Sequence, residues 1–146
     1  MKDPQSERFI LVVEDNPDHI HLIETSFKES LVPHRLMAIA DGQQAIDFLY
    51  RRGEHQTAPR PDLILLDLNL PGKNGWEILA EIKGDRQLRR IPIVVLTTSA
   101  NEDDISRSYA LQGNCYVIKS SNLDQLFQLV KRIEEFWLGI VTLPIE

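Results

Sequence analysis

Short apolar runs alternate along the chain with longer segments in which apolar residues recur three or four positions apart. The runs are rich in β-branched and aliphatic side chains, which predicts buried strands at 9–13, 35–39, 63–66, 93–96 and 115–118. The segment after each run has the periodicity of a helix with one apolar face. This alternation predicts an α/β fold: a doubly wound, five-stranded parallel sheet with helices on both faces.

Capping residues indicate where the helices begin and end. Asn16 followed by Pro17 predicts the start of the first helix, whose apolar face we expect to extend to Leu31. Asp41 precedes the second helix, and Gly113 is expected to end the fourth. Three further starts are predicted by a Glu or Gln three residues after a capping side chain, at Asn74, Ser99 and Asn122.

Polar and charged residues follow four of the five predicted strands. Glu14 and Asp15 come directly after the first strand, and Asp67 follows the third. Thr97 ends the fourth strand and Lys119 follows the fifth. Because the carboxyl ends of parallel strands meet at one edge of the sheet, where doubly wound folds bind ligands, we expect these side chains to converge.

The chemistry of such a cluster is specific. Three carboxylates brought together repel one another unless a cation lies among them, and an oxygen-only ligand set favours Mg²⁺ over zinc. Lys119 and Thr97 can supply a positive charge and a hydrogen bond to a phosphoryl group, and Asp67 can act as a carboxylate nucleophile. Taken singly, each residue has an ordinary explanation as a turn, helix lead-in, strand or surface residue. Their joint occurrence predicts a site.

Composition narrows the possible partners. The chain has 146 residues and a formal net charge of −6, which argues against direct binding to nucleic acid. A basic cluster occurs at Lys83, Arg86, Arg89 and Arg90, but acidic residues interrupt it, and we interpret it as a solvated helix end and loop. No apolar run reaches the roughly 20 residues of a membrane span, so a cytoplasmic protein is expected.

The cysteine and the histidines offer no second predicted site. Cys115 lies in an apolar context typical of a buried strand. The four histidines lack metal-ligand spacing and are interpreted as surface residues: His19, His21, His34 and His55. His19 and His21 flank the expected active edge and could contact a phosphoryl donor.

Four motifs follow one another along the chain and include the polar residues at the strand ends. They are Leu-Val-Val-Glu-Asp-Asn-Pro at 11–17, Leu-Ile-Leu-Leu-Asp-Leu-Asn-Leu-Pro-Gly-Lys-Asn-Gly at 63–75, Pro-Ile-Val-Val-Leu-Thr-Thr at 92–98 and Tyr-Val-Ile-Lys at 116–119. From about residue 8 to residue 138 the chain therefore resembles a two-component receiver domain. The resemblance implies the flavodoxin-like (βα)5 fold and phosphorylation by a sensor histidine kinase.

The resemblance implies roles for residues of the predicted site. Asp67 matches the phosphoacceptor. Mg²⁺ would be bound directly by Asp15, Asp67 and the backbone carbonyl of Asn69, with Glu14 acting largely through water.

Other matched positions concern the phosphoryl group and the switch. Lys119 would pair with the phosphoryl group, and Thr97 would move to hydrogen-bond it. Tyr116 would change rotamer together with Thr97. The side chains of Asn69 and Thr98 occupy positions that tune the lifetime of the phosphoryl group. A receiver of this kind is a phosphoacceptor with intrinsic autophosphorylation and autodephosphorylation activity, and is not otherwise an enzyme.

Two segments resemble a narrower group, the stand-alone regulators of cyanobacterial phytochrome histidine kinases. They are residues 96–104 and residues 133–144, and they imply a phytochrome kinase as donor and a homodimer that signals by protein contact. We predict a receiver domain at 1–138 and an extension at 139–146, with no separate output domain. The predicted dimer surface comprises Leu129, Phe136, Trp137 and Ile140. The alternative is a wide core face with the extension packed down on it.

One departure and two rival functions remain. Ser120 follows Lys119 where the family commonly has a proline in a cis peptide, so the loop after the fifth strand is less predictable. An aspartyl-phosphate hydrolase of the haloacid dehalogenase type would need an acid/base aspartate at the position of Asn69. A pseudo-receiver scaffold would fail to bind Mg²⁺.

Overall fold

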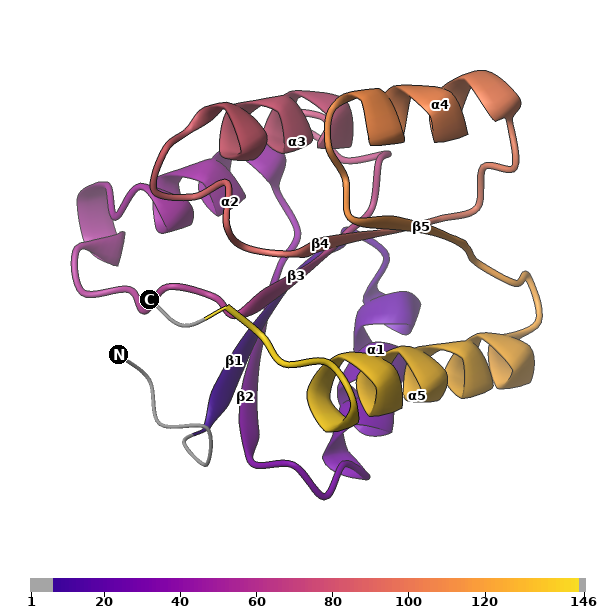
Figure 1. Ribbon diagram of the computed structural model, residues 1–146. Coiled ribbons are helices and arrows are strands. Elements are labelled where there is room, and N and C mark those ends of the chain that lie inside the picture. Colours follow the sequence, from indigo (N-terminus) through magenta and orange to yellow (C-terminus); the bar gives the residue numbers. More distant parts are fainter. Residues whose placement is uncertain (1–6, 145–146) are drawn as a thin grey trace.

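The computed structural model describes residues 7–144 and contains a parallel five-stranded sheet in the order β2-β1-β3-β4-β5 (Figure 1). Its strands are β1 (Arg8–Val13), β2 (His34–Ile39), β3 (Leu63–Leu66), β4 (Ile93–Thr97) and β5 (Cys115–Ile118). The helices are α1 (Pro17–Lys28), α2 (Gly42–Leu49), the short 3₁₀ helix η1 (Gly53–His55), α3 (Gly75–Gly84), α4 (Glu102–Ala110) and α5 (Leu123–Gly139). The predicted α/β fold is confirmed.

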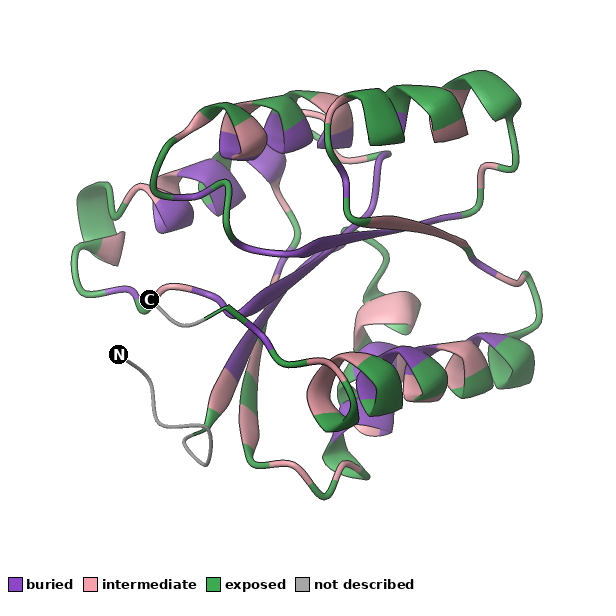
Figure 2. Cartoon of the chain, in the orientation of Figure 1, coloured by how far each residue is buried: buried purple, intermediate pink, exposed green. Residues whose placement is uncertain are grey.

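The helices cover both faces of the sheet, α1 and α5 on one side and α2, α3 and α4 on the other (Figure 1). Successive residues of a strand therefore contribute to two separate cores. Ile10 and Val12 of β1 pack in the core formed with α1 and α5, whereas Leu11 and Val13 pack in the core formed with α2 and α3. Figure 2 shows the central strands buried and the helices exposed on their outer sides, which explains why these strands are continuously apolar.

Four of the predicted helix starts are confirmed, among them Asp41, whose side chain caps α2 by accepting from the Gln44 amide. The Asn16 side chain caps α1, with Pro17 in its first turn, and Asn122 caps α5 by accepting from the Gln125 amide. At α3 both halves of the capping box between Asn74 and Glu77 are present. These caps fix where the chain leaves the carboxyl edge of the sheet.

The prediction that Ser99 caps α4 is wrong. Asn101 is the capping residue, and its side chain accepts from the amides of Asp103 and Asp104. The Ser99 hydroxyl instead donates to the Asp104 carboxylate at 2.6 Å. The helix begins at Glu102, two residues later than a Ser99 cap requires, so the free amides of its first turn lie within reach of Asn101, and the Ser99 hydroxyl accepts from the Asn101 amide at 3.2 Å.

Two predictions about helix ends also need correction. Leu31 was expected on the apolar face of α1, but this helix ends at Lys28, and Leu31 is fully exposed in the following turn. Helix α4 does end shortly before Gly113, yet the residue in the left-handed conformation is Gln112, with φ of 69°. Gly113 instead lies close to the end of the helix, where an added Cβ would make a tight contact of 3.1 Å with the Ser108 carbonyl oxygen.

No helix in the described part of the chain combines the length and the apolar character needed to cross a membrane.

The loop between β3 and α3 folds back tightly onto the end of β3. The Gly75 amide donates to the Leu68 carbonyl at 3.0 Å. A Cβ at Gly75 would lie 2.5 Å from the carbonyl oxygen of Asp67 and equally close to Cα of Leu68. A side chain at this position would therefore displace backbone next to Asp67, so the glycine helps to place that carboxylate.

We expect Gly75→Ala to lower the free energy of unfolding by about 1–3 kcal/mol, because the added methyl group overlaps the backbone of Asp67 and Leu68 directly after β3. Urea unfolding followed by circular dichroism measures this. Gly84→Ala, at the other end of α3, is the matched control, since no atom lies within 4 Å of its Cβ position. It should leave stability unchanged or raise it slightly. Equal losses in both variants would contradict the close-approach explanation.

Candidate functional site

Backbone hydrogen bonds between neighbouring strands align the residues at the carboxyl edge of the sheet. The amide of Glu14 donates to the Ile39 carbonyl at 3.1 Å, and the amide of Asp67 donates to the Val13 carbonyl at 3.0 Å. The Lys119 amide donates to the Thr97 carbonyl at 2.7 Å. The side chains at the ends of four strands are thereby held in one place, as the sequence predicts.

Three carboxylates form the acidic part of the site. Glu14, Asp15 and Asp67 each offer an oxygen, and these atoms lie within 4.8 Å of one another. Glu14 and Asp67 are buried, whereas Asp15 is exposed at the mouth of the site. Burial raises the pKa of Glu14; a hydrogen bond from Lys119 opposes this, and the nearby charge of Asp67 adds to it. The donor set consists of hard oxygen ligands and fits a divalent cation such as Mg²⁺.

Lys119 lies between the buried carboxylates. Its ammonium donates a short hydrogen bond to the Glu14 carboxylate and lies 3.3 Å from Oδ2 of Asp67. The lysine side chain is almost completely buried. A buried charge of this kind is tolerated only when it is paired, so Lys119 and the acids depend on one another.

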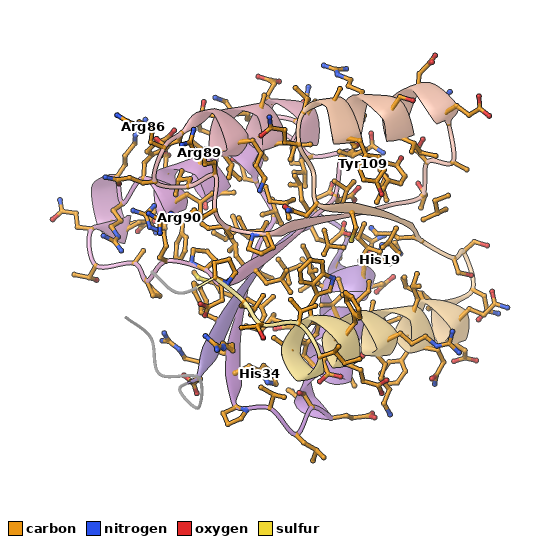
Figure 3. The ribbon with its side chains drawn as sticks, in the orientation of Figure 1. His19, His34, Arg86, Arg89, Arg90 and Tyr109 are labelled. Carbon is orange, nitrogen blue, oxygen red and sulfur yellow. The ribbon has the colours of Figure 1, made fainter. Side chains whose placement is uncertain are left out.

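His19 belongs to the site, although the sequence analysis treated it as a surface residue. It lies in the first turn of α1 (Figure 3), and its Nδ1 is 3.1 Å from the Lys119 ammonium. Burial, followed by the charge of Lys119, lowers the pKa of His19. When the neutral ring carries its own proton on Nε2, Nδ1 can accept a hydrogen bond from the Lys119 ammonium. The sequence did offer one indication of this role: a helix that Asn16 caps must begin beside Glu14 and Asp15, which places His19 near the acids.

A hydrogen-bonded chain leads from the site to α4 and β5. Thr97 is fully buried, and its hydroxyl accepts from the Ser99 amide at 3.5 Å. The Tyr116 hydroxyl donates to the Ser99 carbonyl at 2.9 Å. The Tyr116 amide in turn donates to the hydroxyl of Tyr109 on α4 at 3.2 Å. Sequence reasoning found Thr97 and Tyr116 but missed Ser99 and Tyr109 as the residues that connect them.

Asn69 and Thr98 lie at the rim of the site and are exposed. The Asn69 amide donates to Oδ1 of Asp67 at 3.3 Å, which orients that carboxylate. On the other side of the site, Ser120 holds the loop after β5: its hydroxyl donates to the Gln125 side chain and accepts from the Asn122 amide. The described residues contain no cis peptide bond, so the Lys119–Ser120 bond is not cis.

The four residues of the predicted dimer surface divide into two pairs. Leu129 and Trp137 are partly buried and pack against the core between the sheet and α1. Phe136 and Ile140 point outward and are 48% and 73% exposed. Part of the extension is packed down, since Leu143 is buried. An exposed apolar surface on α5 nevertheless remains.

The remaining histidines and the cysteine lie outside the acidic cluster. Nδ1 of His34 lies 2.8 Å from the Val32 carbonyl oxygen, and the His55 ring packs against Phe48. His21 is exposed on α1. Burial raises the pKa of the Cys115 thiol, which disfavours the reactive thiolate.

Comparisons with known proteins agree with this geometry. Residues 10–131 match the response regulator receiver domain. The chain is 53% identical over 137 residues to response regulator Rcp1 of Synechocystis sp., covering 94% of this chain and 93% of Rcp1.

Two crystal structures extend the comparison. The phosphorylated cyanobacterial phytochrome response regulator RcpA is 56% identical, with a TM-score of 0.93 over 96% of this chain and 100% of RcpA. The Mn²⁺-bound form of Rcp1 is 53% identical, also with a TM-score of 0.93, over 94% of this chain and 99% of that one. With its acids, threonine and lysine at one edge of a β2-β1-β3-β4-β5 sheet, the chain belongs to the response regulator receiver family.

Proposed function

We propose that the protein is the cytoplasmic phosphoacceptor of a histidine–aspartate phosphorelay, phosphorylated on Asp67 by a sensor histidine kinase of the phytochrome type. The observation that carries this proposal is the position of Lys119, which pairs with both Glu14 and Asp67 inside an acidic cluster. The similarity to RcpA and Rcp1 supports the phytochrome kinase as donor. Asn69 lacks the acid/base carboxyl of the hydrolase alternative.

In the proposed transfer, a carboxylate oxygen of Asp67 attacks the phosphorus of a phosphohistidine. The O–P bond forms as the P–N bond breaks, and the imidazole leaving group keeps the electron pair and takes up a proton. Lys119 would exchange its contact with Glu14 for one with the phosphoryl oxygens. Mg²⁺, held by Asp15, Asp67 and the Asn69 carbonyl, with Glu14 acting through water, would neutralise charge on the phosphoryl group.

The proposed output begins at Thr97. Its hydroxyl would turn towards the phosphoryl group and give up its contact with the Ser99 amide. Tyr116 would then break its hydrogen bond to the Ser99 carbonyl and change rotamer. The exposed side chains of Asn69 and Thr98 would control the access of water to the acyl phosphate. The resulting change at α4 and β5 would be transmitted by contact with another protein.

Acetyl phosphate with Mg²⁺ should add a single phosphoryl group to the purified protein, visible by intact mass. Asp67→Asn should abolish the adduct, because it removes the nucleophile. Asp124→Asn, in the first turn of α5, makes the same chemical change away from the site and should retain the adduct. Fast multiple turnover of small phosphate esters would instead favour the hydrolase. An absence of both adduct and metal binding would favour the scaffold.

Metal affinity should fall as the pH is lowered through the raised pKa of Glu14, because the cation and the proton compete for the same cluster. Below that pKa a proton must be released for each Mn²⁺ bound, so the dissociation constant should rise by up to about tenfold per pH unit. Calorimetric titration with Mn²⁺ between pH 5 and 8 (roughly the range in which the native fold is most stable) measures this. Glu14→Gln should flatten the pH dependence, whereas Glu24→Gln, on the outer face of α1, should not. An unchanged profile in Glu14→Gln would contradict the assignment.

We further propose that α5 mediates homodimer formation through Phe136 and Ile140, the exposed members of the predicted surface. Both side chains are apolar and exposed, and the Phe136 ring makes an edge-on contact with Trp137. Exposed aromatic patches are typical of protein interfaces.

The double variant Phe136→Glu, Ile140→Glu should be monomeric by size-exclusion chromatography with light scattering, because it places charge in the interface. Met37→Glu, on the edge strand β2 and 39% exposed, is the control and should leave the dimer intact. A dimer that survives the double variant would assign the contact to another surface.

A further inference from the structure

A cavity lined by arginines lies at the amino-terminal edge of the sheet, opposite Asp67. Its volume is about 330 Å³, and residues before β3 and β4 and after α2 contribute to its walls. The four arginines that line it are Arg51, Arg60, Arg86 and Arg90. Figure 3 shows Arg86, Arg89 and Arg90 gathered at one corner of the molecule. The acid in the lining is Asp62, which accepts from the Phe9 amide and lies 3.9 Å from Arg8. A concentrated positive charge is thus present on a protein of net charge −6.

Two of the cavity's arginines are fixed by backbone contacts. Nε of Arg51 donates to the Ala58 carbonyl at 2.9 Å, and Arg60 donates to the Leu49 carbonyl at 3.3 Å. Within residues 7–144, Arg86 and Arg90 form no hydrogen bond or ion pair through their side chains. Each guanidinium carries five N–H donors in a planar fork, so the cavity presents many unused donors.

The loop that carries Arg86 and Arg90 is held in place from inside. The Lys83 ammonium donates to the carbonyls of Arg89 and Ile91 at 3.0 and 2.8 Å, and to the Asn114 side chain at 2.9 Å. The sequence analysis placed Lys83 in a solvated basic cluster, but its ammonium is used internally, and burial lowers its pKa.

The start of the same loop is capped and anchored. The Asp85 carboxylate accepts from the amides of Gln87 and Leu88 at 2.7 and 3.0 Å. Leu88 and Ile91 are buried in the core below it. The backbone of this loop is therefore held in place, while the side chains of Arg86 and Arg90 extend from it with no hydrogen-bond or ion-pair partner among residues 7–144. Such a preorganised arrangement lowers the entropic cost of binding an anion.

We propose that this arginine cavity binds the diphosphate group of a small molecule. Guanidinium forks match phosphate oxygens in bidentate geometry, and four of them can neutralise the several charges of a diphosphate. The positive surface is a local cavity and not a stripe, so it suits a compact anion better than a nucleic acid.

A second cavity adjoins the arginine cavity and can hold a further part of the ligand. It has a volume of about 250 Å³ and shares Arg51, Arg60 and Gln87 with the first. Tyr50 and Asp85 line its other side. An aromatic ring and a carboxylate can contact the uncharged remainder of a nucleoside diphosphate, whereas inorganic pyrophosphate would occupy the arginines alone.

The test is calorimetric titration of the Asp67→Asn protein with pyrophosphate and with ADP. The buffer contains EDTA, so that neither metal nor the phosphorylation site contributes. We expect one site for pyrophosphate. The double variant Arg86→Gln, Arg90→Gln should weaken it by about tenfold or more, since charge-assisted hydrogen bonds are lost. Arg107→Gln, Arg132→Gln removes the same charge from α4 and α5 and should leave the affinity within about twofold.

The identity of the ligand and the location of the site are distinguished by further measurements. Tighter binding of ADP than of pyrophosphate would identify a nucleotide, and equal or weaker binding would identify the diphosphate alone; either outcome supports the proposal. Backbone amide shifts in NMR should be centred on Gln87, Arg90 and Ile91. Equal loss of affinity in both double variants, shifts centred elsewhere, or preference for an acidic peptide would overturn it.

Discussion

The ammonium of Lys119 joins a cluster of carboxylates that would otherwise repel one another. It contacts Glu14 and Asp67 at the same time, and its side chain is almost completely buried. The parallel sheet makes this possible, because it aligns the ends of β1, β3 and β5 at one edge. Lys119 does not remove all of the repulsion between the carboxylates. Burial raises the pKa of Glu14, and a second cation in the cluster would reduce the repulsion that remains. The excess of negative charge in the cluster therefore favours a divalent cation at this edge of the sheet.

The same edge also connects the site to its surroundings. Ser99 is the central residue of this connection, since its amide contacts Thr97 and its carbonyl contacts Tyr116. The Thr97 hydroxyl is thereby one of the groups that hold the segment before α4. His19 makes a comparable link on the opposite side, between Lys119 and the first turn of α1. The site is thus connected to one helix on each face of the sheet, and each connection uses a single hydrogen bond of moderate length, which is easily exchanged.

The two edges of the sheet carry opposite charge. The carboxyl edge gathers acids around one lysine, and the amino edge gathers arginines around the acid Asp62. Different elements support each of them: the first depends on strand ends and helix caps, the second on the loop between α3 and β4 that Lys83 fastens from below. Substitutions at one edge can therefore be made without disturbing the other, and the two binding functions can be separated experimentally.

The sequence by itself determined the strands, the order of strand and helix, and the residues at the strand ends. These follow from local rules, because a buried parallel strand must be apolar throughout and its polar terminus must lie at the sheet edge. Where several residues compete, local rules were insufficient. Ser99 and Asn101 can both cap a helix, and only the path of the chain decided for Asn101.

The apolar periodicity of α1 continues in the sequence to Leu31, but the helix itself ends at Lys28. The role of His19 was decided by tertiary structure, since its partner Lys119 is 100 residues away in the sequence. Lys83 contacts two nearby carbonyls, but its third partner, Asn114, is 31 residues away. A long polar side chain has no periodic signature, and its surroundings exist only when distant segments pack together. For the same reason, the arginines of the amino edge form a cavity only in the folded chain.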